Sequence, residues 1–435
     1  MGFPKISNRS QQRAADRSER QPWSRRGVLA ALGAVPVAGA LAGCGVSADA
    51  SAGADARTGT DEKAGAHAKA GAPPVAGTKA EVKAPTVTVV PADGTRKAGF
   101  TSPVEVSVSG GTLTTVLVTG NDGSTLAGTF DEARTKWTSS RNPYSGTEYT
   151  VTATPRGGTA QTASFVTRRP SDTFVGRFTP EANSTSGVGM PVSIDFTEAV
   201  RDRAAVEKAI TVSAEPPVEV VGHWFSDTRL DFRPEEYWAA GTTITLGLRL
   251  RDVEGAAGVY GTQSKDVTFR TGRRQVSTVD LAKKTMTVER DGAPRAAYPV
   301  SGGDAAHTTW AGIMVISERF EQTRMESSTV GLGDEYDIAD VPHAQRLTTS
   351  GTFIHGNYWA SPSVFGTTNT SHGCVGLHDA KGAADTSVPG YEFYASSMLG
   401  DVVVVRNSGE RTVEPSNGLN GWNLSWSDWK AGSAL

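Results

Sequence analysis

The segment "NTSHGCVGLHDAKG" contains Cys374, one of only two cysteines in the 435 residues of the chain. A thiol is a nucleophile only as a thiolate, and its pKa falls beside an imidazolium, a backbone N–H group or a helix start. His372 and the amide of Gly373 lie beside the sulfur in sequence, and a helix-compatible stretch follows at residues 378–385. These neighbours favour a catalytic thiol, although a lone cysteine in a β-rich domain is usually an inert buried residue.

The general base is expected to be a histidine that reaches the sulfur from another strand. His372 is tethered two residues from Cys374, and so short a tether limits how its ring can be aimed. In the strand-like run "GTFIHG", alternation places Phe353 and His355 on one face, and the loop that follows can return Cys374 beside His355. Cys374 and His355 are therefore the favoured nucleophile and base.

A zinc site is the alternative use of these side chains. Its ligands would be the sulfur and the nearby imidazoles, those of Cys374, His355, His372 and His378. Structural zinc sites commonly pair two cysteines at C-x-x-C spacing, and the chain contains no such pair. The sequence therefore predicts no metal and no cofactor.

This chemistry needs a scaffold, and residues 275–407 have the pattern of a β-rich domain. Turns at residues 282–284 and 291–292 separate its first strands, and its last strand is "DVVVVRN". Two helices are expected inside it, one over residues 378–385 with Asp379 as its cap and one within "YEFYASSML". A helix directly after the cysteine would lower the pKa of the thiol.

Residues 86–274 show short period-two alternation with frequent turns, which favours an all-β sandwich over helices. The run "WTSSRNPYSGTEYTV" recurs loosely as "FRPEEYWAAGTTITL", and the matching Gly146 and Gly241 are 95 residues apart. That spacing is typical of an immunoglobulin-like domain. The sequence therefore predicts two such domains, at residues 86–170 and 171–274.

The amino terminus has the layout of an export signal followed by a tether. Residues 1–44 combine arginines, a short apolar stretch and the segment "LAGC", which resembles a bacterial lipobox ending at Cys44. Residues 45–85 are dominated by small residues and are expected to form a flexible linker. The protein is therefore expected to be an exported lipoprotein at the outer face of the cytoplasmic membrane, acting in the cell wall. An ordinary secretory signal with a chance cysteine is the alternative.

The carboxyl-terminal segment, residues 408–435, is rich in tryptophan. Trp422, Trp426 and Trp429 have the spacing of one helical face. Such a stripe is most often a packing surface and less often a platform on which sugars stack. We expect it to pack onto the preceding domain.

Two motifs give the β-rich domain a resemblance to a known family. "FIHG", residues 353–356, and "SHGCVGL", residues 371–377, resemble the signature of the L,D-transpeptidase catalytic domain of the YkuD type. The two immunoglobulin-like domains before it and the tail "GLNGWNLSWSDWKAG" after it are similar to the layout of lipid-anchored or membrane-tethered transpeptidases of actinobacteria. The resemblance implies a mainly β protein, in which two immunoglobulin-like sandwiches precede a cysteine-dependent acyltransferase domain.

The resemblance also implies a thioester mechanism. Cys374 would attack the carbonyl of the diamino acid at the third position of a peptidoglycan tetrapeptide stem and release the terminal D-alanine, with His355 as its base. The amides of Gly373 and Cys374 would stabilise the oxyanion. The carbonyl of Gly356 would orient the ring of His355, and His372 would be mainly architectural. The expected product is a 3-to-3 cross-link between two stems.

Five further residues face the substrate if the resemblance holds. Tyr336 corresponds to a lid tyrosine, and Met325 lies in the donor-side segment "RMESSTVG". Trp359, Asn369 and Ser371 correspond to the pocket wall. Plain packing is an equally good reading of a wall aromatic.

The sequence departs from the family pattern at two glycines. Gly376 stands two residues after the nucleophile, where the family often has Asn. Gly356 follows the base, where Ser is frequent. Neither change removes the nucleophile or the base.

The predicted partners are peptidoglycan stem peptides, the membrane through the N-terminal lipid, and carbapenem-type β-lactams that would acylate the cysteine. No nucleic-acid partner is expected, since 43 Lys and Arg face 46 Asp and Glu for a net charge of −3. Two alternatives stay open on the sequence alone. One is an L,D-carboxypeptidase, in which water replaces the acceptor amine, and the other is a non-catalytic wall-binding lipoprotein with an inert cysteine.

Overall fold

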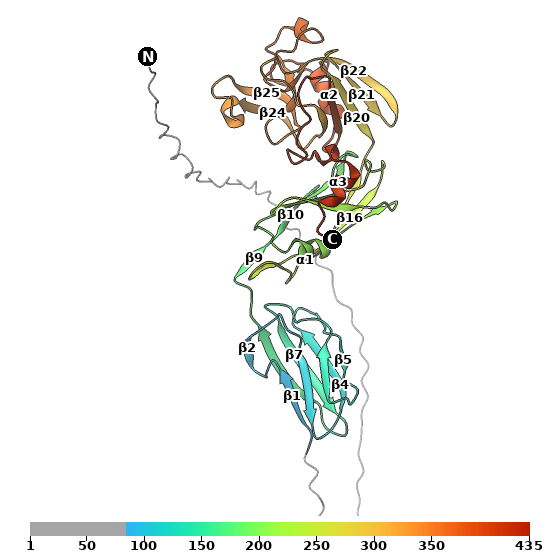
Figure 1. Ribbon diagram of the computed structural model, residues 1–435, viewed down its shortest axis with the longest axis vertical. Coiled ribbons are helices and arrows are strands. Elements are labelled where there is room, and N and C mark those ends of the chain that lie inside the picture. The colour runs from blue at the N-terminus through green and yellow to red at the C-terminus, as the bar shows by residue number, and fades with distance from the viewer. Residues whose placement is uncertain (1–83) are drawn as a thin grey trace, which may run out of the picture. The chain divides into compact units, whose positions relative to one another are not determined.

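The computed structural model describes residues 84–435 of the chain (Figure 1). The predicted signal segment at residues 1–44 with its lipobox cysteine, Cys44, and nearly all of the predicted linker lie outside the described residues. None of the helices within residues 84–435 is both long and apolar enough to cross a membrane.

The first immunoglobulin-like domain is a sandwich of two four-stranded sheets. One sheet has the order β1 (Thr86–Val90), β3 (Glu105–Ser109), β6 (Lys136–Ser139) and β5 (Gly128–Phe130). The other has the order β2 (Thr95–Ala98), β8 (Gln161–Thr167), β7 (Glu148–Pro155) and β4 (Leu113–Gly120). Alternate residues of these strands turn inward, so that Val106, Trp137 and Phe165 share one buried core.

The second immunoglobulin-like domain repeats this plan with extra elements at its edge. One sheet has the order β10 (Gly176–Thr179), β12 (Val192–Phe196), β15 (Arg229–Arg233) and β14 (Val221–Ser226). The second has the order β11 (Thr185–Ser186), β19 (Ser264–Thr271), β16 (Thr243–Arg249) and β13 (Ile210–Glu215). A small third sheet and one helix complete it, formed by β17 (Glu254–Ala256), β18 (Val259–Gly261), β9 (Asp172–Phe174) and α1 (Arg203–Lys208).

The third domain is built on one nine-stranded sheet with the order β23-β28-β20-β21-β22-β27-β26-β25-β24. From the edge inward these strands are β23 (Gly312–Val315), β28 (Val402–Arg406), β20 (Gln275–Asp280), β21 (Thr285–Arg290) and β22 (Ala293–Ser301). The other half comprises β27 (Val375–His378), β26 (Phe353–Asn357), β25 (Asp337–Arg346) and β24 (Glu318–Glu326). Helix α2 (Pro389–Ser396) and the short 3₁₀ helices η1 (Ser327–Val330) and η2 (Pro362–Val364) lie in its connections. The mainly β fold that the sequence predicts is confirmed.

Strand pairing in the centre of this sheet brings the two motifs together. β26 and β27 are adjacent and parallel, and His355 is paired with Gly376. Cys374 directly precedes β27, so the sheet carries the cysteine to the strand beside the histidine. Parallel neighbours need a crossover connection, and the long segment between β26 and β27 provides it.

The prediction of a helix at residues 378–385 is wrong. β27 ends at His378, and the chain then runs through turns. Asp379 does not cap a helix, because its carboxylate is buried and pairs with the ring of His343 at 2.8 Å. The cysteine is therefore followed by a strand, and no helix dipole at this point stabilises a thiolate. The helix expected within "YEFYASSML" is confirmed as α2, and the turns before and after β21 are confirmed as well.

The tryptophans of the tail pack on the second immunoglobulin-like domain, a partner that the predicted packing on the preceding domain did not include. Its tryptophans are divided between η3 (Gly421–Asn423) and α3 (Trp426–Ala431), so they do not form one continuous helical stripe. All three indoles gather around the guanidinium of Arg233, which lies on β15 of the second immunoglobulin-like domain, at 4.4 to 5.4 Å from their ring centroids. Trp429 also donates to the carbonyl of Val221 and is fully buried. Cation–π contacts to the buried guanidinium of Arg233 favour packing of the tail on the second immunoglobulin-like domain.

The tail also holds the catalytic domain, through asparagines. Asn423 accepts from the amide of Ile313 at 2.8 Å, and Asn420 accepts from the amide of Val315 at 3.0 Å, both on β23. The segment thus binds the edge strand of the nine-stranded sheet and the second immunoglobulin-like domain at once. Figure 1 shows the red α3 beside the strands of that second domain.

Candidate active site

Cys374 lies at the inner end of a small apolar cluster. Its side chain packs against the buried cluster of Val341, Ala344 and Phe353, as does Met325 of β24, and it is partly accessible. The thiol donates to the carbonyl of Gly351, with 3.6 Å between sulfur and oxygen. Burial raises the pKa of the thiol to about 11, against smaller opposing effects of the Phe353 amide and the Arg346 guanidinium. The resting sulfur is therefore a neutral thiol.

His355 lies on β26 and is almost completely buried. Its Nδ1 is 2.8 Å from the carbonyl oxygen of Gly356, and since a carbonyl only accepts, Nδ1 carries the hydrogen and Nε2 is left with a lone pair. Burial lowers the pKa of His355, which keeps the imidazole neutral near physiological pH. The indole of Trp359 is parallel to this ring at a centroid distance of 5.8 Å. The geometry gives His355 the tautomer and the charge that a general base needs.

The resting thiol is not hydrogen-bonded to this base. Within residues 84–435, the recorded acceptor of the Cys374 thiol is the carbonyl of Gly351, and no bond joins the sulfur to His355. A protonated thiol can donate its hydrogen to a carbonyl, so this hydrogen need not point toward the imidazole. A turn of the cysteine side chain has to precede proton transfer to His355.

His372 faces the opposite way, toward solvent. Its Nε2 lies 3.2 Å from the Glu335 carboxylate, and 36% of its side chain is exposed. The ring is also 5.1 Å from that of Tyr336, between centroids. Within the described residues no hydrogen bond joins this imidazole to the sulfur of Cys374. Its position is at the mouth of the site.

The loop before Cys374 is held by side chains that the sequence places in the pocket wall. Ser371 donates through Oγ to the carbonyl of Cys374 at 2.5 Å and accepts from the amide of Gly373 at 3.2 Å. Asn369 accepts from the amide of Gly302 and donates to the carbonyl of Leu281. Both side chains are therefore occupied in shaping the loop.

The Gly373 amide is consequently engaged, and an oxyanion would have to displace Ser371 Oγ from it. A bond of 3.2 Å is long for an N–H donor, so the exchange costs little. Gly373 has φ +110°, a backbone conformation that side chains disfavour, although a Cβ there would meet nothing closer than 3.7 Å. Conformation, and not space, requires glycine at this position.

A lid segment, residues 327–336, leads from β24 to β25 and carries the predicted lid tyrosine. Ser327 is fully buried and closes the segment on itself, because its Oγ donates to the carbonyl of Gly333 at 2.7 Å and accepts from the amide of Tyr336 at 3.1 Å. The pKa of the Tyr336 hydroxyl is raised, first by burial and then by the nearby Cys374. The ring of Tyr336 lies 5.1 Å from that of His372, between centroids, on the loop that leads to Cys374.

The two unusual glycines have different structural reasons. A Cβ on Gly356 would lie 2.0 Å from Oδ2 of Asp379, so the buried carboxylate occupies the space that a serine would need. A Cβ on Gly376 would meet its neighbours at 3.5 to 3.6 Å, which is ordinary contact. The first departure is enforced by packing, and nothing in the structure explains the second.

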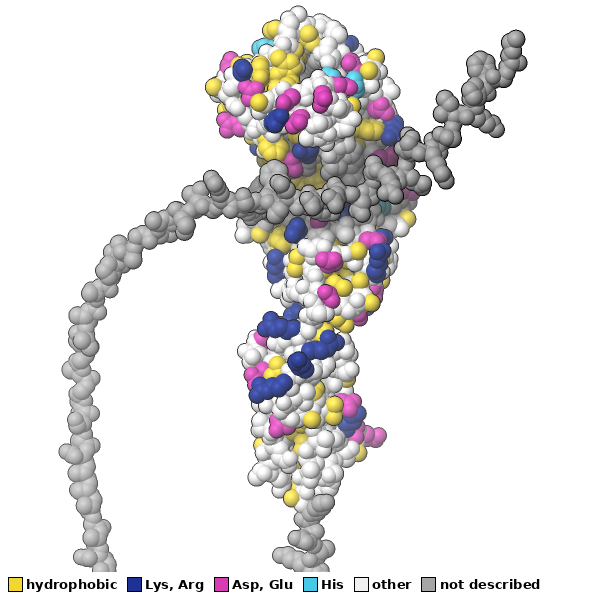
Figure 2. All heavy atoms as spheres, turned by 90° about the vertical axis from the view of Figure 1, so that its left-hand side faces the viewer, with side chains coloured by type: hydrophobic (Ala, Val, Ile, Leu, Met, Phe, Trp, Pro, Cys, Tyr) yellow, Lys and Arg dark blue, Asp and Glu magenta, His cyan; other side chains and the backbone are white. Residues whose placement is uncertain are grey.

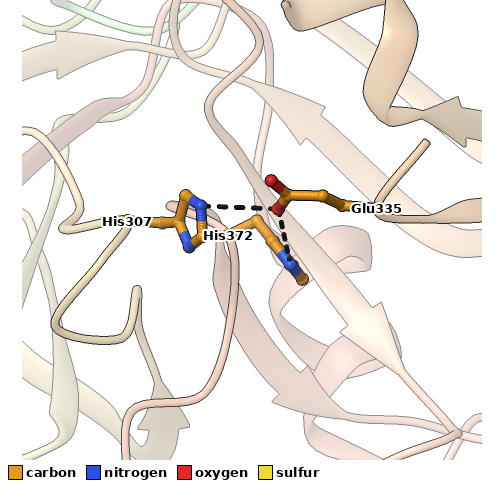
Figure 3. Close-up of side chains that lie close together, drawn as sticks. All are labelled: His307, Glu335 and His372. Atoms are coloured by element: carbon orange, nitrogen blue, oxygen red, sulfur yellow. Dashed lines mark ion pairs between the residues drawn. The ribbon is translucent and has the colours of Figure 1, made fainter. Parts of the chain in front are cut away.

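Sequence reasoning missed three residues around the cysteine. Gly351 supplies the carbonyl that receives the thiol, and His307 and Glu335 surround His372 (Figure 3). Glu335 is the neighbour of the lid tyrosine, and the Asp-x-x-His spacing of Asp304 and His307 directly after β22 was the available signal. The predicted zinc alternative does not form, because the one group of ligating side chains that the described residues bring together contains His372 but neither Cys374 nor His378.

Comparison with known proteins places these residues in a family context. Residues 274–405 match the family model described as the L,D-transpeptidase catalytic domain, and residues 95–254 match a bacterial Ig domain. The chain is 30% identical over 361 residues to L,D-transpeptidase 2 of Mycobacterium tuberculosis, covering 82% of this chain and 86% of that protein. L,D-transpeptidase 5 of the same species is 30% identical over 363 residues, with 81% and 78% covered. A solved structure of L,D-transpeptidase 3 from that species, in complex with a faropenem-derived adduct, is 25% identical, covers 53% of this chain and 97% of that one, and has a TM-score of 0.43.

Proposed function

The chain belongs to the L,D-transpeptidase family, and from that premise we propose that Cys374 is its nucleophile and His355 its general base. Membership confirms the family, the enzyme class and the peptidoglycan cross-linking activity that the sequence predicts. The alternative of a non-catalytic wall-binding lipoprotein is thereby set aside. The proposal therefore concerns the roles of Cys374 and His355 in the two steps of the reaction.

The first half of the reaction makes a thioester. Nε2 of His355 removes the proton from the Cys374 thiol, and the sulfur attacks the carbonyl of the diamino acid in a tetrapeptide stem. The bond from that carbonyl to the terminal D-alanine breaks, and the protonated imidazole gives its proton to the leaving amine. The acyl group is then held on the sulfur and His355 is neutral again.

The second half transfers the acyl group. The side-chain amine of an acceptor stem attacks the thioester, the carbon–sulfur bond breaks, and the new amide is the 3-to-3 cross-link. His355 takes the surplus proton of the amine and returns it to the sulfur. No proton or acyl group is lost over the cycle, and no other energy source is required.

One observation carries the assignment of the base. The hydrogen bond from Nδ1 of His355 to the carbonyl of Gly356 fixes the tautomer whose free nitrogen is Nε2, on the strand next to the one that Cys374 opens. Burial supports it, since a neutral imidazole is already in the form that accepts a proton.

The surroundings favour an amine over water as acceptor. Trp359 is parallel to the His355 ring, and the ring of Tyr336 in the lid segment lies 5.1 Å from that of His372, between centroids. Apolar and aromatic cover lowers the access of bulk water to a thioester. An L,D-carboxypeptidase is the second candidate, because the thiol itself is partly accessible.

Two finer features complete the proposal. Carbapenem-type β-lactams would acylate Cys374, since attack of the sulfur on the lactam carbonyl breaks the strained ring C–N bond and leaves the opened lactam on the sulfur as a thioester, the same kind of linkage that the natural donor forms. The segment "LAGC" supports lipid attachment at Cys44 and a location at the outer face of the cytoplasmic membrane. Incorporation of labelled palmitate, and its loss in Cys44→Ala, tests the anchor.

A purified disaccharide-tetrapeptide separates the candidate reactions. Mass spectrometry of the products is expected to show a dimer that has lost one D-alanine, and no product from Cys374→Ala. Tripeptide without dimer would favour the carboxypeptidase, and turnover by the alanine variant would refute the nucleophile.

A further inference from the structure

Three ligating side chains meet at the mouth of the site, each from a different segment (Figure 3). His307 follows β22, Glu335 belongs to the lid segment, and His372 belongs to the loop of Cys374. Their ligating atoms all lie within 4.8 Å of one another. The proposed reaction uses none of these three groups as acid, base or nucleophile.

The distances suit a metal ion. Oε2 of Glu335 lies 3.4 Å from Nε2 of His307 and 3.2 Å from Nε2 of His372. Nitrogen and oxygen ligands that hold a tetrahedral Zn²⁺ at about 2.0 to 2.2 Å lie about 3.3 to 3.6 Å from one another. The separation of Glu335 from His307 falls in this range, and that of Glu335 from His372 is slightly shorter.

A supporting carboxylate fixes the ring of His307. Nδ1 of His307 is 3.2 Å from Oδ1 of Asp304, and that oxygen is held by the amides of Ala306 and His307 at 2.9 and 2.8 Å. Nδ1 therefore carries the hydrogen, and Nε2 is the nitrogen that can offer a lone pair to a bound ion. A carboxylate behind a ligating histidine is the arrangement commonly found around protein-bound zinc.

The cluster is also reachable from solvent. The exposed fractions of the side chains are 25% for His307, 42% for Glu335 and 36% for His372. Figure 2 shows histidine side chains reaching the surface of the catalytic domain among acidic ones. An ion can therefore enter, and water can take a fourth position beside the three protein ligands.

We propose that His307, Glu335 and His372 bind a divalent transition-metal ion such as Zn²⁺. Two imidazoles and one carboxylate form a borderline-soft donor set that suits this class of cation better than Mg²⁺ or Ca²⁺. The bound ion joins the lid segment to the loop that carries Cys374. It holds the lid in one position and slows the exchange of stems, a consequence that rests on the proposed function, whereas binding does not.

Calorimetric titration of the metal-free full-length protein with Zn²⁺ tests the site. We expect one ion per chain for wild type, and an affinity at least about tenfold weaker for His307→Ala and for Glu335→Gln. Asp304→Asn should weaken binding about 10- to 100-fold, as loss of an outer-shell partner does. Cys374→Ala and His378→Ala are matched controls that should bind like wild type.

Hydrogen exchange of the lid segment is the second measurement. Zn²⁺ should slow exchange at residues 327–336 in wild type and in Cys374→Ala, but not in His307→Ala. Wild type that binds no Zn²⁺, equal binding by wild type and His307→Ala, or loss of binding in Cys374→Ala would overturn the site. Binding without slower exchange would overturn the link to the lid. Neither readout requires turnover, so failure of the proposed function would be seen separately.

Discussion

Two histidines lie on opposite sides of Cys374, and their surroundings differ. His355 lies in the interior of the domain, whereas His372 lies at the solvent-exposed mouth of the site. His355 is 6% exposed, is bonded to one backbone carbonyl, and has its pKa lowered by burial. His372 is 36% exposed and lies against the carboxylate of Glu335. The difference in burial and in contacts favours His355 over His372 as the proposed base, although His372 is nearer to the sulfur in sequence.

The largest effect should come from exchanging the two histidines in turn for alanine. His355→Ala removes the proton acceptor, so kcat for stem cross-linking should fall about 10²- to 10⁴-fold. His372→Ala should change it by less than about tenfold, since its ring does not contact the sulfur. Rates measured with a disaccharide-tetrapeptide check this prediction. A larger decrease of kcat in His372→Ala than in His355→Ala would contradict the assignment of His355 as the base.

The partly buried thiol gives the next largest effect, a dependence of alkylation on pH. Because the pKa of Cys374 is about 11, the thiolate fraction and the rate with iodoacetamide should rise about tenfold per pH unit between pH 7 and 10. Mass spectrometry follows the reaction, with His355→Ala as the control that keeps the same slope. A plateau near neutral pH in wild type would mean that a thiolate–imidazolium pair already exists at rest.

Packing distinguishes the two unusual glycines by stability. Gly356→Ala forces a methyl group against the Asp379 carboxylate and should lower the free energy of unfolding by about 1 to 3 kcal/mol. Gly376→Ala enters ordinary contact distance and should stay within about 0.5 kcal/mol of wild type. Urea denaturation measures the free energy of unfolding of each variant. Equal decreases for Gly356→Ala and Gly376→Ala would show that Gly356 is not the more tightly packed of the two glycines.

The smallest effect is the contribution of His355 to acid sensitivity. Its folded-state pKa lies below the ordinary value of 6.5, so the unfolded chain binds the proton more readily. The stability that the neutral ring contributes is present above pH 6.5 and is lost as the pH falls. The melting temperature of wild type should therefore drop more between pH 7 and 5 than that of His355→Asn. Parallel melting curves would contradict a buried neutral ring.

The sequence predicted the parts of the site that lie in short motifs. Alternation in "GTFIHG" singled out His355 as the base, an assignment that stays a prediction, and turn signals placed the hairpin of β20 and β21. The helix expected after Cys374 was wrong, because Asp379 looked like a cap but pairs with His343 in the interior. A local capping signal cannot reveal that a distant strand supplies the partner.

Long-range contacts account for the other misses. The tryptophans of the tail contact Arg233, a buried residue of the second immunoglobulin-like domain that lies nearly 200 residues earlier in the chain. The spacing of the indoles does not identify this partner. The cluster of His307, Glu335 and His372 likewise depends on three loops that only the folded sheet brings together. The orientation of the thiol toward Gly351 is a rotamer choice that no sequence pattern encodes.

The most direct test of the central claim is the mass of the intact protein after incubation with a carbapenem. Wild type should gain the mass of one carbapenem, Cys374→Ala should gain none, and His355→Ala should acquire the adduct far more slowly. An adduct of equal yield on Cys374→Ala, or no adduct on wild type, would contradict the assignment of Cys374 as the nucleophile.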